Sequence, residues 1–277
     1  MNPENESYGK GKQHQALSSE TAALAHGLTD FKSMESAFVV RAEDELNMYR
    51  DAMKSADSEK WMEACRLEYD TIMGYGSWDL VQKPPEVNVV VCRWTFRIKR
   101  DNLGQIDKYK ARLMAQGFSQ VAGLDFNETY SPTIIFTSIQ LILALACRYN
   151  LELKHVDVKG AYLNGILEDK VYMRQPEGFI ETGKEDLVCK LKKGIYGLKQ
   201  LGRVWHQTLK QEMYKIRFIL SEVDSIIFFK FRNNGSVQLV GWYVDNGLLA
   251  TNSSETMDSM VTAIKGSFEI QDLGEPV

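Results

Sequence analysis

Residues 157–162 read Asp-Val-Lys-Gly-Ala-Tyr, and residues 243–247 read Tyr-Val-Asp-Asn-Gly. The first segment closes an apolar run with the composition of a β-strand, and the second interrupts two such runs in the manner of a tight hairpin. Each segment places one aspartate, Asp157 or Asp245, at a strand end or turn. Pairs of Mg²⁺ ions are held on carboxylates from separate elements of a fold. The two segments therefore predict a strand and a hairpin that bring two carboxylates to one metal site.

Each segment also has a simpler interpretation. Asp-Asn-Gly suits a type I′ hairpin turn, because Asn and Gly adopt positive φ at little cost. An aspartate that closes a strand is more often a solvated residue than a metal ligand. Taken separately, the two segments leave these alternatives open, so the choice depends on the sequence around them.

The surrounding sequence contains a series of specific blocks in a fixed order. They are GSWDLV at 76–81, RWTFRIKR at 93–100, KYKARLMAQGFSQ at 108–120, ETYSP at 128–132, VDVK at 156–159, LNG at 163–165, VYMRQPEGF at 171–179 and IYGLKQ at 195–200. In these blocks the chain resembles the reverse transcriptase of copia-type long-terminal-repeat retrotransposons. The resemblance extends over roughly residues 58 to 277.

This resemblance implies an α+β fold with reverse-transcriptase-like fingers and palm, in which helices cover an antiparallel palm sheet. The implied organisation is a polar N-terminal tail with a possible short helix at 1–57, fingers at 58–130, and a palm at 131–277 from which 165–204 return to the fingers. The implied function is RNA-directed DNA polymerisation by two-metal nucleotidyl transfer. Its cofactor would be Mg²⁺, and its partners an RNA template, a DNA primer and deoxynucleoside triphosphates.

The resemblance also assigns the metal-binding positions. Asp157 and Asp245 match the two metal-binding aspartates, and the backbone carbonyl of Val158 would assist them. Asn246 stands where the family has a further acid, so the site keeps two carboxylates in place of three. An amide oxygen can still bind Mg²⁺ but brings no charge, which predicts weakened catalysis.

The nucleotide-binding positions follow in the same way. Tyr162 matches an aromatic residue that excludes a ribose 2′-hydroxyl, although simple core packing is the alternative for this ring. Lys110 and Arg112 match residues that face the triphosphate, and strand alternation places both on one face. Gly197 would let the backbone approach the nucleotide, and Gln200 would lie beneath it.

Two further departures from the family pattern concern the helix entry and the chain end. Leu201-Gly202-Arg203 replaces Ala-Pro-Arg, and the sequence stops at Val277, before the positions of a thumb and a ribonuclease H domain. We therefore expect a truncated, impaired polymerase domain. The alternatives are a catalytically inactive nucleic-acid-binding remnant and the product of a pseudogene.

Composition and charge agree with this interpretation. A chain of 277 residues that is 44% hydrophobic can bury a core as one large unit or two small ones. The net charge is −4, but residues 88–120 hold seven Lys/Arg against two acids, and residues 189–217 hold eight against one. These basic stretches could meet a phosphate backbone, or could be solvated faces. The four separated cysteines predict reduced buried thiols, and the lack of a signal peptide or apolar span predicts an intracellular protein.

Periodicity and turn residues predict the individual elements. They are a helix that starts at Asp57 or Ser58, a hairpin of strands 89–99 and 106–116, a helix at 138–149, a helix from Gly197 onward, strands at 226–232 and 237–244, a helix capped by Asn252, and an edge strand at 268–273.

Overall fold

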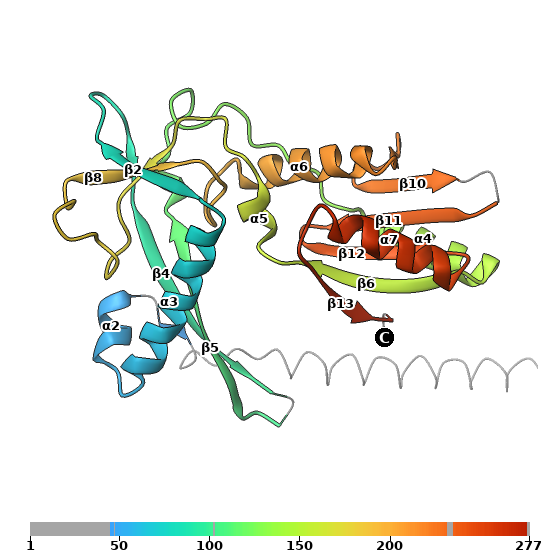
Figure 1. Ribbon diagram of the computed structural model, residues 1–277, viewed down its shortest axis with the longest axis horizontal. Coiled ribbons are helices and arrows are strands. Elements are labelled where there is room, and N and C mark those ends of the chain that lie inside the picture. Colours follow the sequence, from blue (N-terminus) through green and yellow to red (C-terminus); the bar gives the residue numbers. More distant parts are fainter. Residues whose placement is uncertain (1–44, 47, 102, 232–234, 276–277) are drawn as a thin grey trace, which may run out of the picture. The chain divides into compact units, whose positions relative to one another are not determined.

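The computed structural model describes residues 45–46, 48–101, 103–231 and 235–275 (Figure 1). Of the expected polar tail at 1–57, residues 1–44 and 47 lie outside the described residues, and α2 (Tyr49–Lys54) is a short helix within the rest. The chain divides into two compact units, one of residues 1–45 and 97–109, and one of residues 46–96 and 110–277. We describe each unit by itself.

In the first unit, the described residues form the tip of the predicted hairpin, between β4 (Cys92–Arg100) and β5 (Ile106–Ala115). The carboxylate of Asp101 accepts hydrogen bonds from the backbone N–H groups of Leu103 and Gln105. The guanidinium of Arg100 donates to the carbonyl of Gly104. These local bonds close the loop and confirm the hairpin that the sequence predicts. The three-stranded sheet to which β4 and β5 belong has the order β1-β4-β5, with β1 at Glu45–Leu46.

The second unit is built on a six-stranded antiparallel sheet with the order β13-β6-β12-β11-β10-β9 (Figure 1). Its strands are β6 (Glu152–Val158), β9 (Ile219–Leu220), β10 (Ile227–Phe231), β11 (Val237–Tyr243), β12 (Asn246–Thr251) and β13 (Ile270–Gly274). The predicted edge strand is confirmed as β13. The sheet pairs β6 directly with β12, so the two segments that carry Asp157 and Asp245 become neighbours.

Helices pack against both faces of this sheet. On one face, the buried side chains of Val156, Val240 and Trp242 form a core with α6 (Leu201–Lys215) and α7 (Ser254–Lys265). On the other face, α4 (Phe136–Tyr149) packs so closely that a Cβ on Gly241 would lie 2.9 Å from Ile142 Cδ1. The predicted helix at 138–149 is therefore confirmed, and it begins two residues earlier than predicted. The sheet has helices packed on both of its faces.

A second sheet in the same unit has four strands in the order β2-β8-β7-β3. They are β2 (Trp78–Gln82), β8 (Leu187–Leu191), β7 (Tyr172–Met173) and β3 (Val89–Val90). The predicted helix α3 (Ser58–Gly74) brings Tyr69 against Phe179, with ring centroids 4.5 Å apart. The shorter helical elements are α2 (Tyr49–Lys54), the 3₁₀ turn η2 (Gly117–Ser119) and α5 (Ala161–Asn164).

Two predicted helix starts are wrong. The helix expected from Gly197 begins at Leu201, because Gly197 has a φ of +93° and cannot occupy a right-handed helical turn. The cap of α7 is Ser253 and not Asn252. The Ser253 hydroxyl accepts a hydrogen bond from the backbone N–H of Thr256, while Asn252 bonds the backbone at Val237 and Gly235.

The identity of this cap can be tested by stability. Replacing Ser253 with alanine leaves the Thr256 N–H without its acceptor, so we expect a loss of about 1 kcal/mol in the free energy of unfolding. The measurement is urea unfolding followed by circular dichroism. The control, Ser254→Ala, removes an exposed hydroxyl one residue later, whose bond to Glu152 lies in solvent, and should change stability by less than about 0.5 kcal/mol. Equal losses in both variants would refute the cap assignment.

The cysteines differ in their surroundings. All four thiols are free, and burial raises the pKa of Cys65, Cys92 and Cys189 to about 12 each. Cys65 and Cys189 are buried, as the sequence predicts, whereas Cys92 is half-buried. Cys147 is exposed on α4, which corrects the expectation of burial for that residue. The buried side chains of α4 are Ile142 and Ala146, and Cys147 lies outside this buried face.

Candidate metal and nucleotide site

Strand pairing brings the two predicted metal-binding aspartates together. Asn246 lies opposite Asp157 in the β6–β12 register, and the backbone N–H of Val158 donates to the carbonyl of Asp245 at 2.8 Å. In an antiparallel strand the N–H and C=O of one residue point to the same side. The Val158 backbone therefore lies beside the turn that carries Asp245, and the role of its carbonyl as a metal donor stays a prediction.

The turn itself is placed differently from the type I′ alternative considered above. Tyr243 pairs with Asn246, so the two loop residues are Val244 and Asp245, while Asn246 and Gly247 already belong to β12. Val244 has a φ of +56°. This left-handed conformation is rare for a β-branched residue and costs roughly 1–3 kcal/mol. The indole N–H of Trp205 donates to the Val244 carbonyl at 2.7 Å and helps hold this strained residue in place.

Asn246 makes two side-chain hydrogen bonds. Its Oδ1 lies 3.0 Å from His155 Nε2, and its Nδ2 donates to Asp245 Oδ1 at 2.9 Å. His155 is on β6, two residues before Asp157 and on the same face of the strand. The residue that replaces the expected acid therefore joins both strands of the site. Sequence reasoning did not find His155, because nothing in its local pattern signals this contact.

Two tyrosine side chains lie next to each other near this turn, and one of them contacts an arginine of β5. The rings of Tyr162 and Tyr196 meet edge to face with centroids 5.1 Å apart, and the guanidinium of Arg112 lies 5.3 Å from the Tyr196 ring centre. Burial, followed by the nearby charge of Asp245, raises the pKa of Tyr162. Tyr162, Tyr196 and Arg112 thus lie next to one another, and the charge of Asp245 acts on Tyr162. Tyr196 was missed, although it lies inside the quoted block 195–200.

The two basic residues of β5 share an acidic neighbour. Burial raises the pKa of Glu68 on α3, whereas the backbone N–H of Leu113 and the charges of Lys110 and Arg112 lower it. Lys110 is half-buried and Arg112 is exposed. Glu68 therefore balances part of the positive charge, and the sequence analysis did not assign it a role.

Gln200 and Gly197 serve the packing of the loop before α6. The Gln200 side chain is fully buried; its amide donates to the Asp125 carbonyl and to Asp169, and its oxygen accepts from Gln120. With these bonds made, the Gln200 side chain is not open to a ligand in this structure. A Cβ on Gly197 would lie 2.1 Å from the carbonyl oxygen of Ala115, so this position has to be glycine for close backbone packing.

The donor set suits Mg²⁺ only in part. Within the described ranges, there is no cluster of three or more His, Cys, Asp or Glu side chains that could hold a metal ion. Two carboxylates and one carbonyl remain. Mg²⁺ is commonly bound through one or two carboxylates, with water and substrate phosphates as the other ligands. The residues present therefore fit a site that substrate completes, and not a preformed cage.

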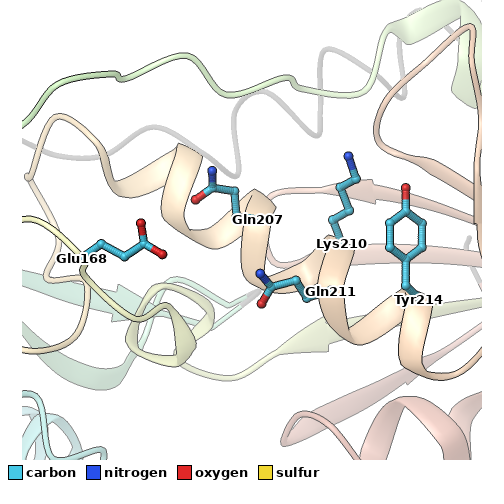
Figure 2. Close-up of a pocket in the computed structure, with 5 residues that line it drawn as sticks. All are labelled: Glu168, Gln207, Lys210, Gln211 and Tyr214. Atoms are coloured by element: carbon cyan, nitrogen blue, oxygen red, sulfur yellow. The ribbon is translucent and has the colours of Figure 1, made fainter.

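A separate pocket lies along α6. It is lined by Glu168, Gln207, Lys210, Gln211 and Tyr214, and Figure 2 shows four of these side chains projecting from the helix. None of the residues with a predicted metal or nucleotide role lines it. In the described part of the chain, no helix has the length and apolar character needed to span a membrane.

Comparison with known proteins shows the family of this chain. Residues 75–276 match the family model described as reverse transcriptase (RNA-dependent DNA polymerase). The chain belongs to the reverse transcriptase family. It is 38% identical over 224 residues to the Pol polyprotein of transposon RE1 and 36% identical to that of RE2, both from Arabidopsis thaliana. It is 34% identical over 225 residues to the Pol polyprotein of transposon TNT 1-94 from Nicotiana tabacum.

These matches identify a reverse transcriptase domain of copia-type Pol polyproteins, and they confirm the resemblance that the blocks predicted. They cover 80–81% of this chain but only 15–17% of the polyproteins. Among solved structures, a telomerase from Candida tropicalis matches 78% of this chain and 56% of its own at 10% identity, with a TM-score of 0.39, too low to support an argument.

Proposed function

We propose that this reverse transcriptase domain adds deoxynucleotides to a DNA primer on an RNA template by two-metal nucleotidyl transfer, with impaired efficiency. The observation that carries the proposal is the pairing of β6 with β12, which sets Asp157 beside the Asp245 turn. In this proposal the six-stranded sheet is the palm, the segment at 58–130 with residues 165–204 forms the fingers, and the protein works inside the cell.

The metal side of the proposal rests on two carboxylates. Bound Mg²⁺ would supply charge stabilisation at the attacking and leaving oxygens. Asp157 and Asp245 would hold it, with the Val158 carbonyl as a further oxygen donor. The bond from Trp205 to the Val244 carbonyl would hold the turn, and the bond from Asn246 Nδ2 would orient the Asp245 carboxylate before substrate binds.

The nucleotide side of the proposal uses the two tyrosines and the basic residues of β5. Arg112 would grip the triphosphate, with Lys110 as a second cation, because a guanidinium can bind two phosphate oxygens at once. Tyr162 lies against Tyr196 and next to Asp245, where its ring would oppose a ribose 2′-hydroxyl. Gln200 and Gly197 would act indirectly, by fixing the loop that carries Tyr196.

The amide at position 246 favours a second candidate function, in which the domain binds nucleic acid without catalysis. An amide in place of a carboxylate lowers the charge available to a divalent cation. The basic stretches at 88–120 and 189–217 would serve both candidates. Primer extension separates them, because only the first candidate predicts Mg²⁺-dependent or Mn²⁺-dependent synthesis.

The role of Tyr162 provides a specific test. Replacing Tyr162 with alanine removes the ring that would exclude a 2′-hydroxyl, so we expect the preference for deoxynucleotides over ribonucleotides to fall roughly tenfold to a hundredfold. The measurement is single-nucleotide incorporation with Mn²⁺ and each nucleotide in turn. Tyr214→Ala, which removes an exposed tyrosine of α6, should leave the ratio unchanged. An unchanged ratio in Tyr162→Ala would exclude this role.

A further inference from the structure

The hydrogen bonds of Asn246 fix the orientation of its amide. Oδ1 can only accept, so His155 Nε2, 3.0 Å away, must carry the proton that it shares. Nδ2 can only donate, and Asp245 Oδ1 accepts from it at 2.9 Å. Rotating the amide by half a turn would set its oxygen against the carboxylate oxygen of Asp245 and its NH₂ group against Nε2 of His155. The contact with Asp245 would become repulsive, whereas His155 could still accept from the NH₂ group in its other tautomer, so the Asp245 carboxylate decides the orientation and His155 Nε2 then carries the shared proton.

This orientation has a consequence for metal binding. Oδ1 is the side-chain atom of Asn246 that can bind a cation, and it is engaged by His155. The NH₂ group, which cannot bind a cation, faces Asp245. Register and alternation place His155, Asp157 and Asn246 on one face of the paired strands, so His155 can reach Asn246 without displacing Asp157.

We propose that His155 is a positioning residue that holds Asn246 as a hydrogen-bond donor to Asp245 and keeps its oxygen away from the metal. The site then offers a divalent cation its two carboxylates and the Val158 carbonyl, without the amide oxygen of Asn246. This inference rests on the proposed metal role of Asp157 and Asp245. It predicts that removing His155 strengthens the binding of a divalent cation, whereas the loss of a residue beside a metal site usually weakens it.

The test is Mn²⁺ alone, titrated into the full chain and followed by the electron paramagnetic resonance signal of free Mn²⁺. His155→Leu and His155→Val cannot donate to Asn246, so its amide keeps the bond to Asp245 but loses the bond to His155, and a cation on Asp245 can then draw the amide oxygen toward itself. We expect each variant to bind Mn²⁺ roughly threefold to tenfold more tightly than the unaltered chain, a smaller change than the usual effect of disturbing residues around a metal site. His155→Gln keeps a donor and should bind within about twofold of the unaltered chain.

Two further variants show whether a negative result contradicts only the role of His155 or also the proposed metal site. The gain should vanish in the double variant His155→Leu/Asn246→Ala, because no amide oxygen remains. The double variant Asp157→Asn/Asp245→Asn should lose the Mn²⁺ site altogether. If that loss occurs but His155→Leu and His155→Val bind no more tightly than the unaltered chain, the inference is overturned while the proposed function stands. If the double aspartate variant binds Mn²⁺ normally, both are overturned.

A measurement on the unaltered chain tests the same inference even if both His155 variants unfold. In the ¹⁵N nuclear magnetic resonance spectrum of the imidazole, Nε2 of His155 should carry the proton, and the side-chain NH₂ of Asn246 should exchange slowly with solvent. An unprotonated Nε2 would overturn the inference directly. Thermal unfolding of each variant, followed by circular dichroism, identifies variants that are not folded at the titration temperature.

Discussion

Replacing Gly197 with alanine should destabilise the fold by about 3 kcal/mol or more, the largest loss of stability that we expect from adding one methyl group to this chain. Two costs add. Gly197 has a φ of +93°, a conformation that residues with a Cβ rarely adopt. The new Cβ would also lie 2.1 Å from the Ala115 carbonyl oxygen, which is backbone and has little freedom to move. Urea unfolding followed by tryptophan fluorescence measures the change.

Two control variants separate these costs. Gly183 has a φ of +79° but open space around its Cβ position, so Gly183→Ala should lose only about 1 kcal/mol, from conformation alone. Gly74 ends a helix in open space without a positive φ, and Gly74→Ala should be close to neutral. A Gly197→Ala variant as stable as Gly183→Ala would show that the loop and β5 do not approach as closely as described.

Replacing Asn246 with aspartate should raise primer extension roughly tenfold to a hundredfold, the range by which disturbed metal-site residues usually change metal affinity or activity. The new carboxylate adds a negative charge beside Asp245 and opposite Asp157, where a divalent cation would offset the repulsion among the three acids. The measurement is synthesis on an RNA template with Mg²⁺ and then with Mn²⁺. We expect the unaltered chain to be near background with Mg²⁺.

Matched carboxylate-to-amide changes serve as controls. Asp157→Asn and Asp245→Asn, each made in the Asn246→Asp background, should return synthesis to background, because each removes a proposed metal ligand. Asp258→Asn makes the same chemical change on an exposed face of α7 and should have no effect. Efficient synthesis by the unaltered chain would mean that the amide at 246 is tolerated, and the proposed impairment would then be wrong.

The sequence by itself determined the elements whose signals are local. The apolar stripe of α3 and the two strand runs around Asp101 identified a helix and a hairpin that the structure contains. Ordered blocks identified the family, and the strand-end position of Asp157 together with the Asp245 hairpin identified two residues that the sheet brings together. Their roles as metal ligands stay a prediction, as do the nucleotide roles.

Tertiary structure decided the features that depend on contacts between distant segments. Local preference would place Asn246 and Gly247 in the turn, yet pairing of β12 with β6 and the bond from Trp205 move the turn to Val244 and Asp245. The same pairing brings His155 to Asn246, a contact between residues 91 positions apart. Sequence periodicity reports which face of an element is apolar, but it does not report which atoms meet across a sheet. These contacts across the sheet determine the hydrogen-bond partners of Asn246, on which the proposed metal site depends.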